Sequence, residues 1–101
     1  MSRRTELQAV LESILGGEQV YFQPPSNVEM EYDCIVYERS RMETRFADNG
    51  PYSLIDRYQV TAIYRNPDSD LPRRIAKLPM CSHERHFTSD NLHHDVFNLY
   101  Y

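Results

Sequence analysis

The chain has 101 residues, which is enough for one domain and too few for two. Hydrophobic residues make up 41% of it and charged residues 26%, which is the composition of an ordinary globular protein. The formal net charge of −4 argues against sequence-specific nucleic-acid binding, because that function usually needs a basic face.

The N-terminal segment predicts an amphipathic helix, and neither a signal peptide nor a membrane span is expected anywhere in the chain. Thr5 with Gln8 can form a capping box at the helix start, and Gly16-Gly17 ends the helix. A single apolar stripe of this kind packs most simply against a sheet. The residues that recur at helical spacing are Leu7, Val10, Leu11, Ile14 and Leu15.

The middle of the chain predicts strands. Val20 to Phe22 is followed by Pro24-Pro25, which a central strand does not tolerate, so this piece is an edge strand or an extended arm. Cys34 to Arg39 is rich in β-branched and aromatic residues and predicts a strand that can continue through Met42 to Phe46. We expect a soluble protein made in a reducing cytoplasm, although the sequence leaves the redox state of Cys34 and Cys81 open.

A hairpin with a long, polar and flexible end is predicted around Asp48-Asn49-Gly50-Pro51, which is a strong turn sequence. The strand after the turn is Arg57 to Tyr64, and its residues alternate between two faces. We expect the end of the hairpin, about Ser40 to Tyr52, to project from the domain. The face expected to be apolar consists of Tyr58, Val60, Ala62 and Tyr64.

A second helix is predicted after Asn66-Pro67-Asp68, with Ser69 or Asp70 as its cap. Its apolar stripe consists of Leu71, Ile75 and Leu78. Two strands then follow, Glu84 to Thr88 and Asp95 to Tyr100, joined by a turn at Ser89-Asp90-Asn91. The whole order predicts an α+β fold in one domain, residues 1–101. It has an antiparallel or mixed β-sheet of four to five strands with two helices packed on one face.

One cluster has the side chains that a zinc site uses: Cys81, His83, His86, His93, His94 and Asp95. In a strand, however, alternate side chains face opposite sides. His83 and His86 are an odd number of residues apart, so we expect them on opposite faces, and we expect His93 and His94 to diverge as well. The prediction is therefore no metal site. A small metal-dependent hydrolase that uses these histidines remains the distant alternative.

No catalytic residue and no cofactor are predicted. The sequence contains neither a Gly-rich phosphate loop nor a nucleophile elbow. Four acidic residues could be imagined as a nuclease carboxylate set, but no lysine lies near them to complete it, so we expect solvated side chains. These residues are Glu29, Glu31, Asp33 and Glu38.

Two features suggest association with other subunits. The projecting hairpin carries basic and apolar residues, and the last strand is aromatic and would be an aggregation hazard if it were an exposed edge. The residues alone leave an equal alternative, in which the last strand lies centrally and the hairpin contacts nothing. The predicted interface residues are Arg41, Met42, Arg45, Phe46, Tyr52, Phe97, Tyr100 and Tyr101.

Short phrases along nearly the whole chain resemble small virion proteins of tailed bacteriophages, in particular the tail-terminator (tail-completion) family. The resemblance implies a structural protein without catalytic residues. It implies an α+β subunit that forms a homohexameric ring, caps the tail tube and joins the head-completion proteins. Among the phrases that carry it are Val20-Tyr21-Phe22-Gln23-Pro24-Pro25, Tyr32-Asp33-Cys34-Ile35-Val36-Tyr37, Tyr58-Gln59-Val60-Thr61, Leu78-Pro79-Met80-Cys81-Ser82 and His94-Asp95-Val96-Phe97.

The partners that the resemblance implies are further copies of the chain, the tail-tube protein and a head-completion or neck protein. Genomic DNA would pass through the ring without specific binding, which suits an acidic subunit because a basic lumen would hold the phosphates. The protein would be made in the host bacterial cytoplasm and reside in the tail or neck region of the virion, with no membrane involved. The alternatives are a head-completion (stopper) subunit, another minor capsid protein, or a monomeric inhibitor of a host factor.

Overall fold

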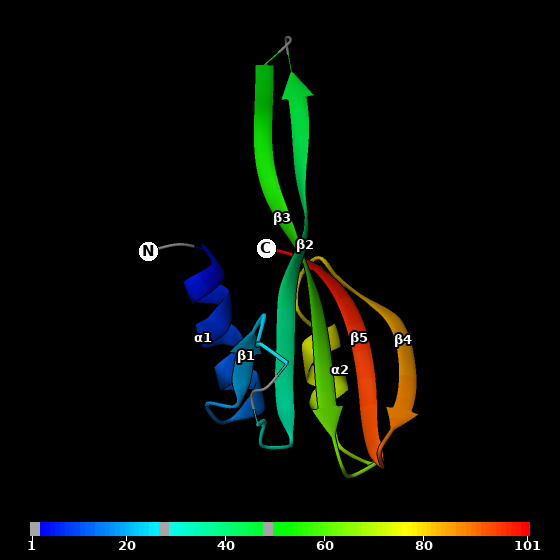
Figure 1. Ribbon diagram of the computed structural model, residues 1–101. Coiled ribbons are helices and arrows are strands. Elements are labelled where there is room, and N and C mark those ends of the chain that lie inside the picture. Colours follow the sequence, from blue (N-terminus) through cyan, green and yellow to red (C-terminus); the bar gives the residue numbers. More distant parts are fainter. Residues whose placement is uncertain (1–2, 27–28, 48–49) are drawn as a thin grey trace.

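The chain forms a mixed five-stranded β-sheet with two helices, which confirms the predicted fold class (Figure 1). The computed structural model describes residues 3–26, 29–47 and 50–101, and side chains within these ranges except those of residues 41–55. The strand order is β1-β2-β3-β5-β4, with β1 parallel to β2 and every other neighbouring pair antiparallel. The elements are α1 (Arg3–Leu15), β1 (Val20–Phe22), β2 (Cys34–Ala47), β3 (Gly50–Tyr64), α2 (Leu71–Ala76), β4 (Cys81–Ser89) and β5 (Leu92–Tyr100).

One face of the sheet and both helices share a single core. The alternation predicted for the strand after the turn is confirmed, because the four residues expected on its apolar face are all buried. Burying an aliphatic side chain of the size of valine or leucine contributes about 2 kcal/mol to the stability of the fold. The helix residues that fill the core are Leu7 and Leu11 from α1 and Leu71 and Ile75 from α2. Neither of the described helices is long and apolar enough to cross a membrane.

The start of α1 differs from the prediction. The helix begins at Arg3, so Thr5 lies within it and the predicted capping box with Gln8 is wrong. Gln8 instead ties the helix to the sheet: its side-chain amide donates to the Val20 carbonyl at 3.0 Å, and its carbonyl oxygen accepts a hydrogen bond from the Tyr37 hydroxyl. A residue assigned to the cap by local pattern therefore serves tertiary packing.

The end of α1 is as predicted. Leu15 is the last helical residue, and the Gly16 N–H donates to the Glu12 carbonyl at 2.8 Å. Gly16 has a φ of 79°, the left-handed conformation that commonly ends helices and that a side chain disfavours.

Gly16→Ala is expected to lower the free energy of unfolding by about 1 kcal/mol. The cause is conformational, because an added Cβ at Gly16 would meet nothing within 4 Å. Urea denaturation followed by circular dichroism measures the change. Ser13→Ala, at an exposed position of the same helix, is the matched control and should leave the midpoint nearly unchanged. An equal effect of the two substitutions would contradict the left-handed cap.

The β2–β3 hairpin continues far beyond the sheet (Figure 1). Its strands pair from Cys34 opposite Ile63 as far as Ala47 opposite Gly50. Because the hairpin projects, the molecule is elongated and measures 51 × 23 × 23 Å along its principal axes. Ser40 has no partner in the register and forms a β-bulge. Bulges bend a strand, and this one lies where the hairpin leaves the sheet. In the predicted turn, Asp48 and Asn49 lie outside the described residues, and β3 begins at the next position.

The last strand is central and not an edge. β5 pairs with β3 on one side and with β4 on the other, so the strand has the central position that one of the two alternatives gave it. Phe97 is 1% exposed and packs in the core, so its assignment to an interface is wrong. Tyr100 and Tyr101 are half-buried, and the Tyr101 carbonyl accepts a hydrogen bond from Arg3 Nε at 2.8 Å.

The C-terminal half follows its local signals closely. The Ser69 hydroxyl accepts a hydrogen bond from the Leu71 N–H at 3.3 Å, whereas the Asp70 side chain caps nothing. Between β4 and β5, Asp90 and Asn91 have φ values of 53° and 63°. Positive φ at both central residues is the requirement of a two-residue type I′ turn, so the strands extend further toward this turn than predicted.

Candidate functional site

The first candidate site is the distal hairpin, which we define as residues 42–47 and 50–55. In the described β-ladders these residues pair with each other, except that Met42 lies opposite Asp56 and Tyr52 has no partner in the register. The neighbouring strands join the hairpin only nearer its base, where Arg57 lies opposite Tyr100. The predicted interface residues on this part of β2 and β3 have described backbones, but their side chains lie outside the described set. They are Arg41, Met42, Arg45, Phe46 and Tyr52.

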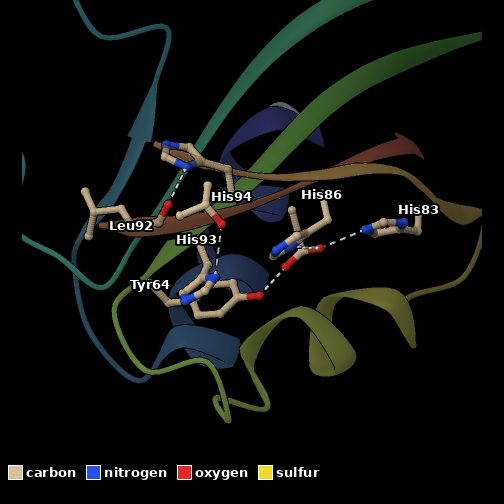
Figure 2. Close-up of polar contacts among 8 residues, drawn as sticks. Tyr64, His83, His86, Leu92, His93 and His94 are labelled. Atoms are coloured by element: carbon tan, nitrogen blue, oxygen red, sulfur yellow. Dashed lines mark hydrogen bonds and ion pairs between the residues drawn. The ribbon is translucent and has the colours of Figure 1, made fainter. Parts of the chain in front are cut away.

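The second candidate site is built around Asp95 on β5. Figure 2 shows the side chains of Tyr64, His83 and His86 converging on one carboxylate. The Tyr64 hydroxyl donates to Oδ2, whereas His83 Nε2 and His86 Nδ1 lie 2.8 and 3.0 Å from Oδ1. Asp95 is 6% exposed and is the one charged residue that is buried in the described part of the chain. We call these four residues the Asp95 cluster.

The prediction that His83 and His86 face opposite sides of the sheet is wrong. His83 lies opposite Phe97 and Arg85 lies opposite Val96, so Glu84 between them is an extra residue in a β-bulge. The bulge shifts the alternation by one position and brings both imidazoles to the same side of the edge strand.

His93 and His94 do diverge, as expected. The His93 ring stacks on Tyr64 and on His86, with ring centroids 5.4 and 5.7 Å apart. The His94 ring stacks instead on Phe87 at 4.5 Å. One adjacent histidine therefore extends the Asp95 cluster, and the other belongs to the opposite face of the sheet.

The residues described do not assemble a metal centre. No group of three or more His, Cys, Asp and Glu side chains among them is arranged to hold a metal ion. Both histidines of the cluster use the same oxygen of Asp95, and Tyr64 uses the other. Within the same described ranges, neither His83 nor His86 is hydrogen-bonded to a serine or cysteine that could serve as a nucleophile.

The acidic residues considered as a nuclease set are all exposed: Glu29, Glu31, Asp33 and Glu38. Asp33 accepts a hydrogen bond from the Arg65 N–H at 3.0 Å, which is a structural role. Both cysteines are free thiols in the structure. Burial, followed by the charge of Asp33, raises the pKa of Cys34 to about 12, so this thiol is a poor nucleophile.

The charge state of the Asp95 cluster follows from its hydrogen bonds. Burial alone would raise the pKa of Asp95, but the bonds from Tyr64, His83 and His86 outweigh burial and hold the pKa below its usual value. Burial, the hydrogen bond to Asp95 and its negative charge raise the pKa of Tyr64 to about 12. At neutral pH the cluster therefore contains an ionised carboxylate beside a protonated phenol.

This electrostatic arrangement predicts a pH-dependent stability. Because folding lowers the pKa of Asp95, its contribution is present above the unfolded value of about 4 and is lost as the pH falls through the folded value. Tyr64→Phe removes one of the hydrogen bonds that lower this pKa. We expect its urea midpoint to fall less between about pH 6 and about pH 3 than that of the wild type.

Tyr21→Phe is the matched control, because its hydroxyl bonds the exposed Glu31 N–H instead of the cluster. It should show the acid dependence of the wild type. Identical acid dependence in all three proteins would mean that the Tyr64 bond does not lower the pKa of Asp95.

A cavity of about 340 Å³ opens beside the Asp95 cluster. It lies between α2, the loop that precedes α2, the edge strand β4 and its neighbour β5. Its volume is within the range of about 300–1,000 Å³ that is usual for ligand pockets. Its lining includes all four residues of the cluster together with Arg73 and Phe97.

Comparison of the chain with protein-family models, with curated proteins and with solved structures finds no match. The two candidate sites differ in kind. One is a projecting backbone ribbon suited to another protein, and the other is a polar cavity suited to a small chemical group.

Proposed function

We propose that this protein is a structural virion protein of a tailed bacteriophage, a tail terminator that caps the tail tube as a homohexameric ring. The observation that carries the proposal is the distal hairpin. A two-stranded ribbon is marginally stable in water when nothing packs against it. A neighbouring subunit or the end of the tube would supply that packing, and the sequence resemblance to the tail-terminator family supports these partners.

A ring also needs a second surface that differs from the first, because cyclic assemblies join two unlike patches of neighbouring subunits. The open edge of the sheet is a candidate for it. β4 is the outermost strand on the side of the described sheet opposite β1, and eight of its nine residues are exposed. The hairpin and this edge belong to different parts of the molecule, as a head-to-tail ring requires.

The remaining partners in the proposal are the tail-tube protein below the ring and a head-completion or neck protein above it. The net charge of −4 supports a conduit through which genomic DNA passes without specific binding. In this proposal the protein resides at the head-proximal end of the tail.

Quantitative mass spectrometry of purified particles, combined with electron microscopy, tests the proposal. We expect about six copies per particle, with the major capsid and tail-tube proteins as internal standards, and density at the head-proximal end of the tube. Density on the head side of the joint would favour the head-completion (stopper) alternative. Absence from the particles would exclude every virion role and leave the monomeric inhibitor and the more distant hydrolase alternative.

A further inference from the structure

The floor of the cavity carries a negative charge that no permanent cation balances. Asp95 is bonded by Tyr64, His83 and His86, and no lysine or arginine of the described chain forms an ion pair with it. A buried carboxylate is normally paired with a cation. Its partners are a phenol and two imidazoles, none of which carries a permanent positive charge, so a cation entering the cavity would be attracted.

The two histidines add acceptors to this floor. A neutral imidazole has one N–H, and the bond to Asp95 places that proton on Nε2 of His83 and on Nδ1 of His86. The other ring nitrogens keep their lone pairs, and no hydrogen bond from a described residue occupies them. The cavity thus combines one anion with two acceptors, which suits a ligand with several N–H donors.

The walls of the cavity are largely apolar and include two aromatic rings. Tyr64 and Phe97 line the cavity, and the His83 ring packs edge-on against Phe97 with centroids 5.2 Å apart. Aromatic faces attract cations, and a guanidinium group both stacks on rings and presents five donors in one plane. Guanidinium therefore fits the cavity better than an ammonium group does.

The chain does not fill this cavity with its own arginine. Arg73 on α2 lines it, is exposed, and forms no hydrogen bond or ion pair with any residue that the structure describes. Its positive charge at the rim would oppose an incoming cation and would favour an anion. Removing the charge of Arg73 should therefore strengthen the binding of a cation and weaken the binding of an anion, which distinguishes the two classes of ligand.

We propose that the cavity beside Asp95 binds the guanidinium group of an arginine from the β2–β3 hairpin of a second copy of this chain, either Arg45 in the distal hairpin or Arg41 directly before it. The source of the arginine rests on the proposed ring. The hairpin extends the molecule to 51 Å against 23 Å in the other directions, so it reaches far beyond its own sheet. Arg45 lies in the distal hairpin and Arg41 directly precedes it, and a positive charge on either complements the carboxylate.

Titration with N-acetyl-L-arginine methylamide tests the chemistry in the isolated protein. We expect saturable shifts of the imidazole NMR signals of His83 and His86, with affinity about tenfold lower in Asp95→Asn and higher in Arg73→Ala. The neutral analogue N-acetyl-L-citrulline methylamide is the control. If Asp95→Asn does not fold, His83→Phe, on the exposed edge strand, replaces it and should also weaken binding.

Equal shifts with the arginine and citrulline probes would overturn the guanidinium assignment. Binding of inorganic phosphate that is weakened by Arg73→Ala would do the same and identify an anion site. These outcomes are independent of the ring, because they concern the cavity of one subunit.

Cysteine cross-linking of the assembled protein tests the source. In a Cys34→Ala/Cys81→Ser background, Glu43→Cys or Thr44→Cys, which keep both arginines, combined with Ser69→Cys at the cavity should give a ladder of disulfide-linked oligomers. Arg65→Cys, exposed outside the cavity lining, replaces Ser69→Cys as the matched control. If a ring forms but the Ser69→Cys variant gives no disulfide-linked oligomers, the hairpin is not the source of the guanidinium group, and the proposed function still stands. Particles that lack the protein overturn the ring itself.

Discussion

Removal of the distal hairpin is expected to abolish assembly while leaving the sheet folded. Replacing residues 43–55 by an Asn-Gly turn joins Met42 to Asp56, which lie opposite each other in the register. The part of the hairpin that pairs within the sheet is kept, as is the ion pair between Arg39 and Asp56 at 3.2 Å. In a complementation assay, joined head–tail particles should fall to the level obtained without the gene.

The control for the new turn is a full-length chain with Asp48→Asn and Asn49→Gly, which introduces the same dipeptide without shortening the hairpin. It should assemble as the wild type does. Circular dichroism and urea denaturation of the shortened monomer should show an intact cooperative transition. A shortened protein that folds, enters particles and joins heads to tails at the wild-type level would contradict the role of the hairpin.

Local sequence patterns predicted most of the elements, because each depends on neighbours in the chain. The alternation from Tyr58 to Tyr64 has the period of a strand with one buried face, and that face is buried. Gly16 marks the helix end because only its backbone conformation closes the last turn without strain. Pro24-Pro25 confines β1 to the sheet edge, where the structure places it.

The position of the last strand could not be predicted in the same way. Whether β5 is central or at an edge depends on where β3 and β4 lie, and their separation in sequence carries no such information. The aromatic residues of β5 suited both alternatives, since a central strand buries them and an edge strand exposes them to a partner.

The Asp95 cluster was missed for a different physical reason. The β-bulge at Glu84 reverses the alternation that separated His83 from His86, and no glycine or proline marks it in the sequence. A signal was nevertheless present. Asp95 has the same strand parity as Phe97 and Leu99, which fill the core, and a charged residue on a core face requires hydrogen-bond partners.

Phe97→Ala is expected to lower the free energy of unfolding by about 3–5 kcal/mol, because it leaves a cavity under the sheet. Phe97 is 1% exposed and packs with the residues of both helices. A domain of this size has a total stability of about 5–15 kcal/mol, so the variant should be partly unfolded at moderate temperature. Urea denaturation measures the loss, and Asn98→Ala, the next residue on the opposite face of β5, should change stability by less than about 1 kcal/mol.

The same substitution separates a core residue from an interface residue. If Phe97 served a partner, its removal would leave the monomer as stable as the wild type and reduce only assembly. A core role predicts the reverse order: the monomer loses stability first, and assembly fails in proportion to the unfolded fraction. Phe97→Ala also removes the aromatic ring that packs against His83, with ring centroids 5.2 Å apart. Binding of N-acetyl-L-arginine methylamide to the folded fraction of the variant should therefore weaken. A stable Phe97→Ala monomer that no longer assembles would restore the interface role that its burial argues against.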